Sequence, residues 1–210
     1  MEGDFMVYIL SITLGIVVGI ILKGKVSNIL NLKFEKVWII LLAFMIQVTA
    51  QILGYRGFDV ITGNIFLIQA CVFCLLFLGF WFNRQYLGIL VIGAGGFLNA
   101  VVMMLNGGKM PVSLDVLASA NLTEAIDMLK SGLDNKHAII NESTRLGFMA
   151  DTIFIPGFPG LLMRIVSIGD LIVIAGFFLL LVEVVSGRTI FKRPKTLNEK
   201  NGGIVNEKTD

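Results

Sequence analysis

The sequence predicts an all-α integral membrane protein with five transmembrane helices and an outer cap of short amphipathic helices. Of its 210 residues, 56% are apolar and only 15% are charged, and the mean hydropathy is +0.85. The charges gather in a few stretches and leave long uncharged runs between them. Since a soluble protein of this size must cover its surface with polar groups, these runs indicate helices that lie in lipid.

Five apolar runs approach the roughly 20 residues that a helix needs to cross a bilayer. They cover residues 5–22, 37–53, 65–82, 86–105 and 168–186. The first run does not resemble a cleaved secretory signal, because acidic Glu2 and Asp4 precede it and basic residues follow it. We therefore expect it to stay as an anchor, so that residues 1–186 form a single membrane domain.

The positions of lysine and arginine predict the orientation of these helices, because short basic segments stay on the cytoplasmic side. The segments after the first, third and fifth helices carry Lys23, Lys25, Lys33, Lys36, Arg84, Arg188, Lys192, Arg193, Lys195, Lys200 and Lys208. The opposing segments, residues 1–4 and 54–64, carry only Arg56. We expect the N-terminus outside and the C-terminus in the cytoplasm, with residues 187–210 as a disordered polar tail.

Residues 106–167 then form one long connection outside the membrane, which we call the cap. Ser113 and the pair Asn121 and Glu124 precede apolar patterns as helix-start signals, and they predict two short amphipathic helices. These helices either lie on the membrane surface or pack on the bundle as a lid. Residues 136–140 predict a short strand, and the Pro-Gly-rich residues 156–160 predict an apolar segment that dips into the interface.

Two acidic residues, Asp151 and Asp170, flank this Pro-Gly segment and are the candidate catalytic residues. We expect the chain to dip and return at the Pro-Gly turn, which would bring the two residues to a similar depth. Two carboxylates that share a site can hydrolyse amides, because one takes a proton from water while the other donates a proton to the substrate. Asp170 has a second interpretation, since it completes a helix capping box with Ser167. We expect neither a metal nor another cofactor, because His137 is the only histidine and has no cysteine near it.

Five further polar residues are candidates for orienting or binding a substrate. Asn106 and Arg145 would orient the reacting groups, although Arg145 can equally form an ion pair that only orders its loop. His137 either relays protons or is an ordinary loop histidine. Lys109 either meets an anionic head group or only extends toward water from a helix end. Ser167 accompanies Asp170 at the start of the last helix.

The segments 147–151 and 166–176 resemble the C-terminal motifs of bacterial lipoprotein signal peptidases, which are aspartyl proteases of the membrane. Gly147, Asp151, Asp170 and Gly176 fall on the positions of that family's two glycines and two catalytic aspartates. The resemblance implies that Asp151 and Asp170 form a catalytic pair acting on a peptide or lipopeptide. The chain departs from the family at Ser167, where the family has Asn, and in having five predicted spans instead of four.

A second resemblance covers most of the chain. Its motifs are residues 106–112, His137, residues 144–146, Asp151 and residues 167–170. Together they resemble a family of uncharacterised bacterial multi-pass membrane proteins, known only as a domain of unknown function. This resemblance implies a location in the bacterial cytoplasmic membrane and supplies no activity.

Small and charged residues within the helices predict further contacts. Gly15, Gly19 and the glycines of residues 93–96 would let helices approach closely, within the chain, in a homo-oligomer or in a membrane complex. Glu183, near the cytoplasmic end of the last helix, is expected to reach toward Arg188.

Two hypotheses for function follow. In the first, the protein is an aspartyl hydrolase that cuts a peptide or lipopeptide at the outer membrane interface. In the second, it is a non-enzymatic membrane module, namely a sensor, a subunit of a complex, or a binder of lipid or a small solute. The net charge of +2 and the dispersed phenylalanines argue against a nucleic-acid partner, and the lipid bilayer is the expected surrounding.

Overall fold

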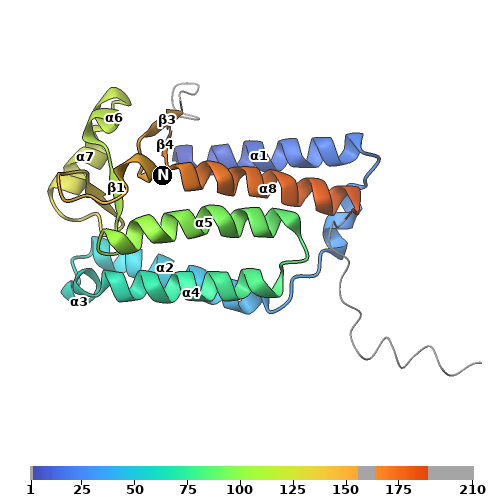
Figure 1. Ribbon diagram of the computed structural model, residues 1–210, viewed down its shortest axis with the longest axis horizontal. Coiled ribbons are helices and arrows are strands. Elements are labelled where there is room, and N and C mark those ends of the chain that lie inside the picture. The colour runs from blue at the N-terminus through green and yellow to red at the C-terminus, as the bar shows by residue number, and fades with distance from the viewer. Residues whose placement is uncertain (1, 156–163, 189–210) are drawn as a thin grey trace, which may run out of the picture.

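The computed structural model describes residues 2–155 and 164–188, and it places a cap of short elements at one end of a bundle of long helices (Figure 1). In chain order the helices are α1 (Glu2–Ile21), η1 (Val26–Asn31), α2 (Val37–Tyr55), α3 (Asp59–Gly63), α4 (Ile65–Phe82), α5 (Leu87–Leu105), α6 (Leu114–Ser119), α7 (Thr123–Lys130), η2 (Gly147–Met149) and α8 (Ile168–Ser186). The strands are β1 (Met110–Val112), β2 (His137–Ile139), β3 (Ile153–Ile155) and β4 (Arg164–Val166).

Four of the described helices are long and apolar enough to cross a membrane, namely α2, α4, α5 and α8. The predicted segments 65–82 and 168–186 coincide with α4 and α8, and the other two agree within two residues at either end. The apolar part of α1 is shorter and covers residues 7–21. The protein is therefore a mostly helical membrane protein with four candidate spans, while the fifth span and the orientation stay predictions.

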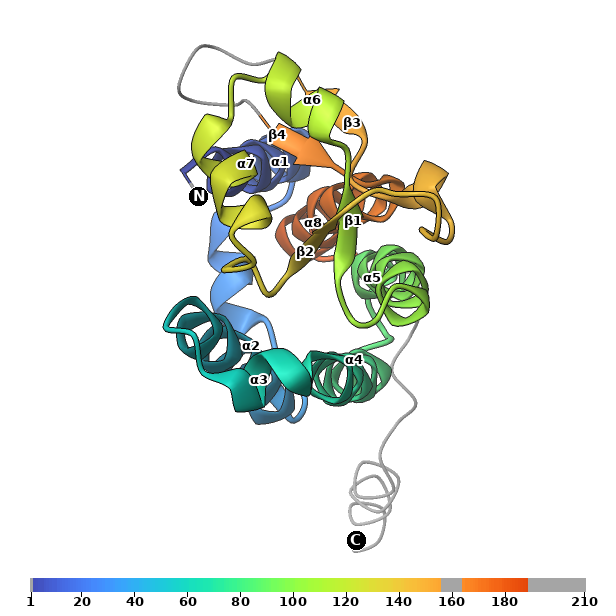
Figure 2. The same cartoon turned by 90° about the vertical axis from the view of Figure 1, so that its left-hand side faces the viewer.

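The helices form a curved row in the order α1, α8, α5, α4, α2, as the view along the bundle shows (Figure 2). The last helix of the sequence, α8, packs between α1 and α5. The pair α2 and α4 joins the rest through contacts of α4 with α5. The bundle therefore consists of a tightly packed group, α1, α8 and α5, and a pair, α2 and α4, attached to one side of it.

Glycines allow the close approach around α8. A side chain at Gly19 of α1 would place its Cβ 2.6 Å from the Cβ of Val185, and one at Gly95 of α5 would come within 2.5 Å of the carbonyl oxygen of Gly169. Since such distances are too short for two atoms that are not bonded to each other, neither position can hold a larger residue without moving a helix. The contacts of these glycines lie within one chain.

The α5–α8 pair is also fastened by a buried carboxylate. Glu183 of α8 accepts hydrogen bonds from the backbone N–H groups of Leu87, at 3.1 Å, and Gly88, at 2.8 Å. These donors belong to the first turn of α5, where backbone N–H groups have no partner within the helix. The prediction that Glu183 reaches toward Arg188 is wrong, because its carboxylate caps the neighbouring helix α5. Arg188 is bonded to Glu183 through the backbone, where its N–H donates to the Glu183 carbonyl.

Short strands hold the cap together. β1 pairs in parallel with β2, with Met110 opposite His137, and β3 pairs antiparallel with β4, with Ile153 opposite Val166. An isolated bridge joins Val112 to Asp151 on the other edge of β1. The predicted strand at residues 136–140 is confirmed as β2, but the other three strands depart from the all-α prediction. Each has only three residues, which is too short for an alternating pattern to appear in the sequence.

The two predicted helices of the cap are present as α6 and α7. The Oγ atom of Ser113 caps α6 by accepting a hydrogen bond from the backbone of Val116 at 3.4 Å. The predicted start of α7 at Asn121 is wrong, because the helix begins at Thr123 and Asn121 has a left-handed backbone with φ of 56°. The predicted interfacial segment 156–160 and the tail from residue 189 lie outside the described residues.

Candidate functional site

Three titratable side chains meet in the cap around the ring of His137. Its Nδ1 atom lies 2.8 Å from Oδ2 of Asp134, and its Nε2 atom lies 3.7 Å from Oδ2 of Asp151. The side chains of His137 and Asp151 are 27% and 11% exposed, so the second pair is largely shielded from water. We call Asp134, His137 and Asp151 the cap cluster.

The backbone of the cap brings these residues together from separate segments. His137 lies opposite Met110 on one edge of β1, while Asp151 bridges to Val112 on the other edge. The backbone N–H of Asp151 donates to the carbonyl of Pro111 at 2.9 Å, which fixes the segment after η2 beside β1. The central strand therefore aligns a histidine and an aspartate from segments that are distant in the sequence.

Asp134 is fixed by its own turn and stays charged. Its Oδ1 atom accepts the backbone N–H groups of Lys136, at 2.8 Å, and His137, at 3.0 Å. Burial by itself would raise the pKa of Asp134, but the ring hydrogen bond and charge of His137, together with the two backbone donors, lower that pKa well below its ordinary value of 3.8. The cap cluster thus contains a carboxylate that is ionised at every physiological pH.

The turn that carries Asp134 is docked on helix α2. The neighbouring Asn135 is buried, and its Nδ2 atom donates to the carbonyl of Ala50 at 2.9 Å. Gly54, one turn further along α2, has no side chain, so that Asn135 can lie against its backbone. Lys109 braces the same turn by donating from Nζ to the carbonyl of Asp134 at 3.1 Å. The predicted head-group contact of Lys109 stays a prediction.

Asp170 occupies a different polar cluster at the start of α8. It forms a capping box with Ser167, in which the two residues exchange hydrogen bonds between side chain and backbone at 3.1 and 3.0 Å. Asn99 of α5 adds two bonds, donating to Oδ1 of Asp170 and accepting from Oγ of Ser167, both at 2.9 Å. The capping box agrees with the capping interpretation, and the two bonds to Asn99 join α8 to α5.

The predicted catalytic pair lies at the foot of one hairpin. Because β3 and β4 are antiparallel and Ile153 faces Val166, the chain returns after the hairpin to the level of Asp151. The contacts of the two carboxylates differ, however, since Asp151 faces His137 and Asp170 binds Asn99. The return of the chain agrees with the sequence analysis, while a shared catalytic water between Asp151 and Asp170 stays a prediction.

Asn106 and Arg145 are brought together through the backbone. Asn106 ends α5, and its amide donates to the carbonyls of Val102 at 2.8 Å and Arg145 at 2.9 Å, while its Oδ1 accepts the N–H of Arg145 at 2.9 Å. The ion pairs of the described residues do not include the exposed guanidinium of Arg145. Asn106 is thus a clamp that ties the cap to α5, and Arg145 has no described contact with either candidate aspartate.

The sequence analysis missed Asp134. Its spacing of three residues before His137, two residues after the turn residue Gly132, is the pattern of an aspartate that binds the backbone of its own turn. This signal could have been found without the structure. Within the described parts of the chain, no group of three or more His, Cys, Asp or Glu residues could hold a metal ion.

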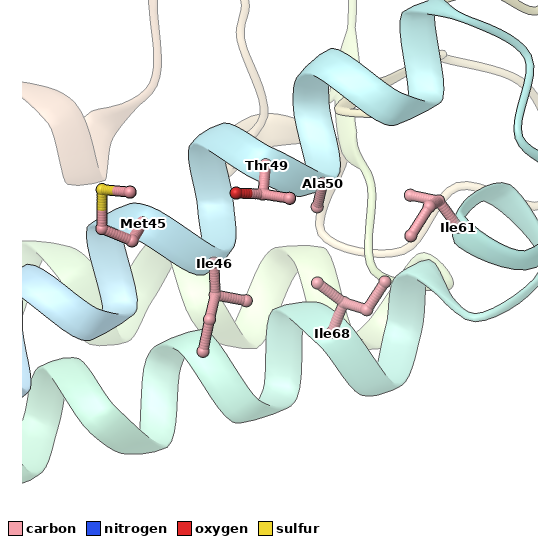
Figure 3. A pocket seen from close by; sticks show the side chains of 6 residues that line it. All are labelled: Met45, Ile46, Thr49, Ala50, Ile61 and Ile68. Atoms are coloured by element: carbon pink, nitrogen blue, oxygen red, sulfur yellow. The ribbon is translucent and has the colours of Figure 1, made fainter.

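A pocket of about 340 Å³ lies beside the cap, between α2, α3 and α4 (Figure 3). It is lined by Met45, Ile46, Thr49, Ala50, Ile61 and Ile68. The lining is apolar except for the hydroxyl of Thr49. Ala50 belongs both to this pocket and to the docking contact of Asn135, so the pocket and the cap share one turn of α2.

Comparison with known proteins places these features in a family. A family model described as "Family of unknown function (DUF5317)" matches residues 31–182. The chain is 29% identical over 163 residues to an uncharacterised protein of Thermotoga maritima, covering 77% of this chain and 83% of that protein. No solved structure matches the chain. The resemblance to an uncharacterised family is confirmed, whereas the resemblance to lipoprotein signal peptidases stays a prediction because neither match carries an assigned activity.

Proposed function

Because the chain belongs to DUF5317, a family of unknown function, we propose its function from its own geometry: it is a non-enzymatic, proton-responsive sensor of the membrane. In this proposal the cap is the sensing unit and the helices that it touches are the responding unit. The cap faces the outside of a bacterial cytoplasmic membrane, and the presence of a relative in Thermotoga maritima supports the bacterial location.

One observation carries the proposal, namely the position of His137 between two carboxylates that lead to different helices. Asp134 adjoins Asn135, which is docked on α2. Asp151 adjoins the β3–β4 hairpin, which leads directly into Ser167 and α8. A change in the contact between His137 and Asp151 would therefore alter the connection between the α2–α4 pair and the group of α1, α5 and α8.

The direction of the response follows from the chemistry of the ring. Histidine is the side chain whose charge ordinarily changes between about pH 5 and 8. A protonated His137 donates from both nitrogens, to Asp134 and toward Asp151. A neutral His137 that keeps the Nδ1 donor for Asp134 instead turns an Nε2 lone pair toward the carboxylate of Asp151. The cap contact is therefore tighter with the protonated ring, at acidic pH, and looser with the neutral ring, at alkaline pH.

Distance measurements between two spin labels test this response. The labels are placed on Arg56, which follows α2, and on Phe148, an exposed residue of η2, in a background of Cys71→Ala and Cys74→Ala. Double electron–electron resonance then gives the distance distribution at pH 5 and pH 8. A partly shielded ion pair contributes ~1 kcal/mol, so we expect the ratio of the shorter to the longer population to fall about fivefold as the pH rises.

The decisive variant is His137→Gln, which keeps a donor for Asp134 but cannot be protonated. We expect its distance distribution to be the same at both pH values. Glu142→Gln, at an exposed carboxylate of the cap, is the matched control and should respond like the unsubstituted chain. A wild-type distribution that does not change with pH, or a response that survives in His137→Gln, would contradict the sensor proposal.

The aspartyl hydrolase remains the second candidate, favoured by the return of the chain to the level of Asp151 after the hairpin. The variants Asp151→Asn and Asp170→Asn distinguish the hydrolase from the sensor. If the protein is a hydrolase, both variants should fail to cleave a lipopeptide, while the amount of folded protein stays unchanged. The sensor proposal instead expects Asp170→Asn to keep its pH response and to lose stability, because the amide weakens the capping box and the bond to Asn99.

A further inference from the structure

The connections at the end of the bundle opposite the cap (Figure 1) carry exposed basic side chains. They lie in the connections around η1, between α4 and α5, and after α8. We call them the basic belt: Lys23, Lys25, Lys33, Lys36, Arg84 and Arg188. The nearby acids offset only part of this charge, because Glu183 is buried as the cap of α5 and Glu35 is one carboxylate beside six cations.

Aromatic side chains mark the depth of the belt in the membrane. The chain has two tryptophans, Trp38 in the first turn of α2 and Trp81 in the last turn of α4, and each is 62% exposed. Tryptophan prefers the level of the lipid head groups, where its ring is half apolar and half polar. Both rings therefore place the water–lipid interface at the basic belt.

Two of the cations are held against aromatic rings at this level. Nζ of Lys36 lies 3.9 Å from the ring centre of Phe82, and the guanidinium carbon of Arg84 lies 4.3 Å from the ring centre of Trp81. The guanidinium also donates to the carbonyl of Trp81 at 2.7 Å. In η1, between the lysines, Leu30 is 88% exposed. An apolar side chain in this position suits the acyl region just below the head groups.

We propose that the basic belt binds the head groups of anionic phospholipids. Its positive charge complements a phosphate-rich surface that carries net negative charge. The exposed side chains of Trp38, Trp81 and Leu30 keep this charge at the depth of the head groups. The inference depends on the membrane-spanning helices and not on the sensor proposal. It proposes which class of lipid binds at the end of the protein opposite the cap cluster.

Tryptophan quenching by brominated lipids measures this selectivity, because both tryptophans of the chain lie at the belt. The protein is reconstituted into vesicles of phosphatidylcholine and phosphatidylglycerol in one fixed ratio. In one set only phosphatidylglycerol carries bromine, and in the other an equal fraction of phosphatidylcholine does, so the surface charge is the same in both. With about fivefold preference for each cation near the surface, we expect at least fivefold enrichment of phosphatidylglycerol beside the tryptophans.

The test variant is Lys36→Gln/Arg84→Gln, and its matched control is Arg56→Gln/Lys130→Gln, which removes the same charges from exposed positions at the cap end. We expect the enrichment to fall severalfold in the first, which loses the two cations beside the tryptophans, and to stay unchanged in the second. The ratio of the two quenching curves is taken within each variant, so a direct effect of Arg84 on tryptophan emission cancels. Equal quenching by both lipids in the wild-type chain, or an enrichment in Lys36→Gln/Arg84→Gln as large as in the wild-type chain, would overturn the proposal.

Discussion

Substitution of Glu183 tests whether one buried carboxylate joins α5 to α8. Its two oxygens accept the backbone N–H groups of Leu87 and Gly88 at 3.1 and 2.8 Å, and the residue is only 6% exposed. In Glu183→Ala both donors lose their acceptor at the buried start of α5. In Glu183→Gln one amide oxygen can still accept, but the NH₂ group faces the other donor.

The magnitude follows from these two bonds. A hydrogen bond to a charged group contributes ~1.5–3 kcal/mol, and a buried donor left without an acceptor costs about 1–3 kcal/mol. We therefore expect Glu183→Ala to lower the free energy of unfolding by about 3–5 kcal/mol. Glu183→Gln should lower it by roughly half as much, because one of the two bonds is kept.

The assay is unfolding in mixed micelles by titration with sodium dodecyl sulfate, followed by tryptophan fluorescence. Glu142→Ala and Glu142→Gln are the matched controls, because Glu142 is an exposed carboxylate of the cap, and we expect changes within about 0.5 kcal/mol. Equal stability of the Glu183→Ala and Glu142→Ala variants would refute the reasoning, and so would a loss in Glu183→Gln as large as that in Glu183→Ala.

Two further predictions concern helix packing and acid stability. Gly95→Ala should destabilise the bundle by about 1–3 kcal/mol in the same titration, because its Cβ would lie 2.5 Å from the carbonyl oxygen of Gly169. Gly96→Ala, with nothing within 4 Å, should be neutral or slightly stabilising, and a similar loss at both positions would contradict the packing argument. The depressed pKa of Asp134 gives the cap stability that is present above the ordinary value of 3.8 and is lost as the pH falls below it. Limited proteolysis of the cap should therefore accelerate in acid, and less so in Asp134→Asn; equal acceleration in both would show that Asp134 does not carry this stability.

The candidate site was only partly predictable, because its residues are joined by strands too short to leave a pattern. Asp151 and His137 were recognised as polar candidates, and the return of the chain before Ser167 agrees with the hairpin. Their contact across β1 could not be inferred, since it requires the pairing of three segments that are distant in the sequence. Asp134 was missed although its spacing from His137 is a local signal.

The sequence by itself determined the membrane class, the positions of the long apolar helices, the caps at Ser113 and Ser167, and the basic character of one end. These features depend on local composition, because each helix must be apolar over its own length and each cap is a bond within a few residues. Only the tertiary structure decided that α8 packs between α1 and α5, that Glu183 caps α5, and that His137 faces Asp151. These contacts join residues far apart in the chain, where their partners are fixed by packing in space and not by spacing in sequence.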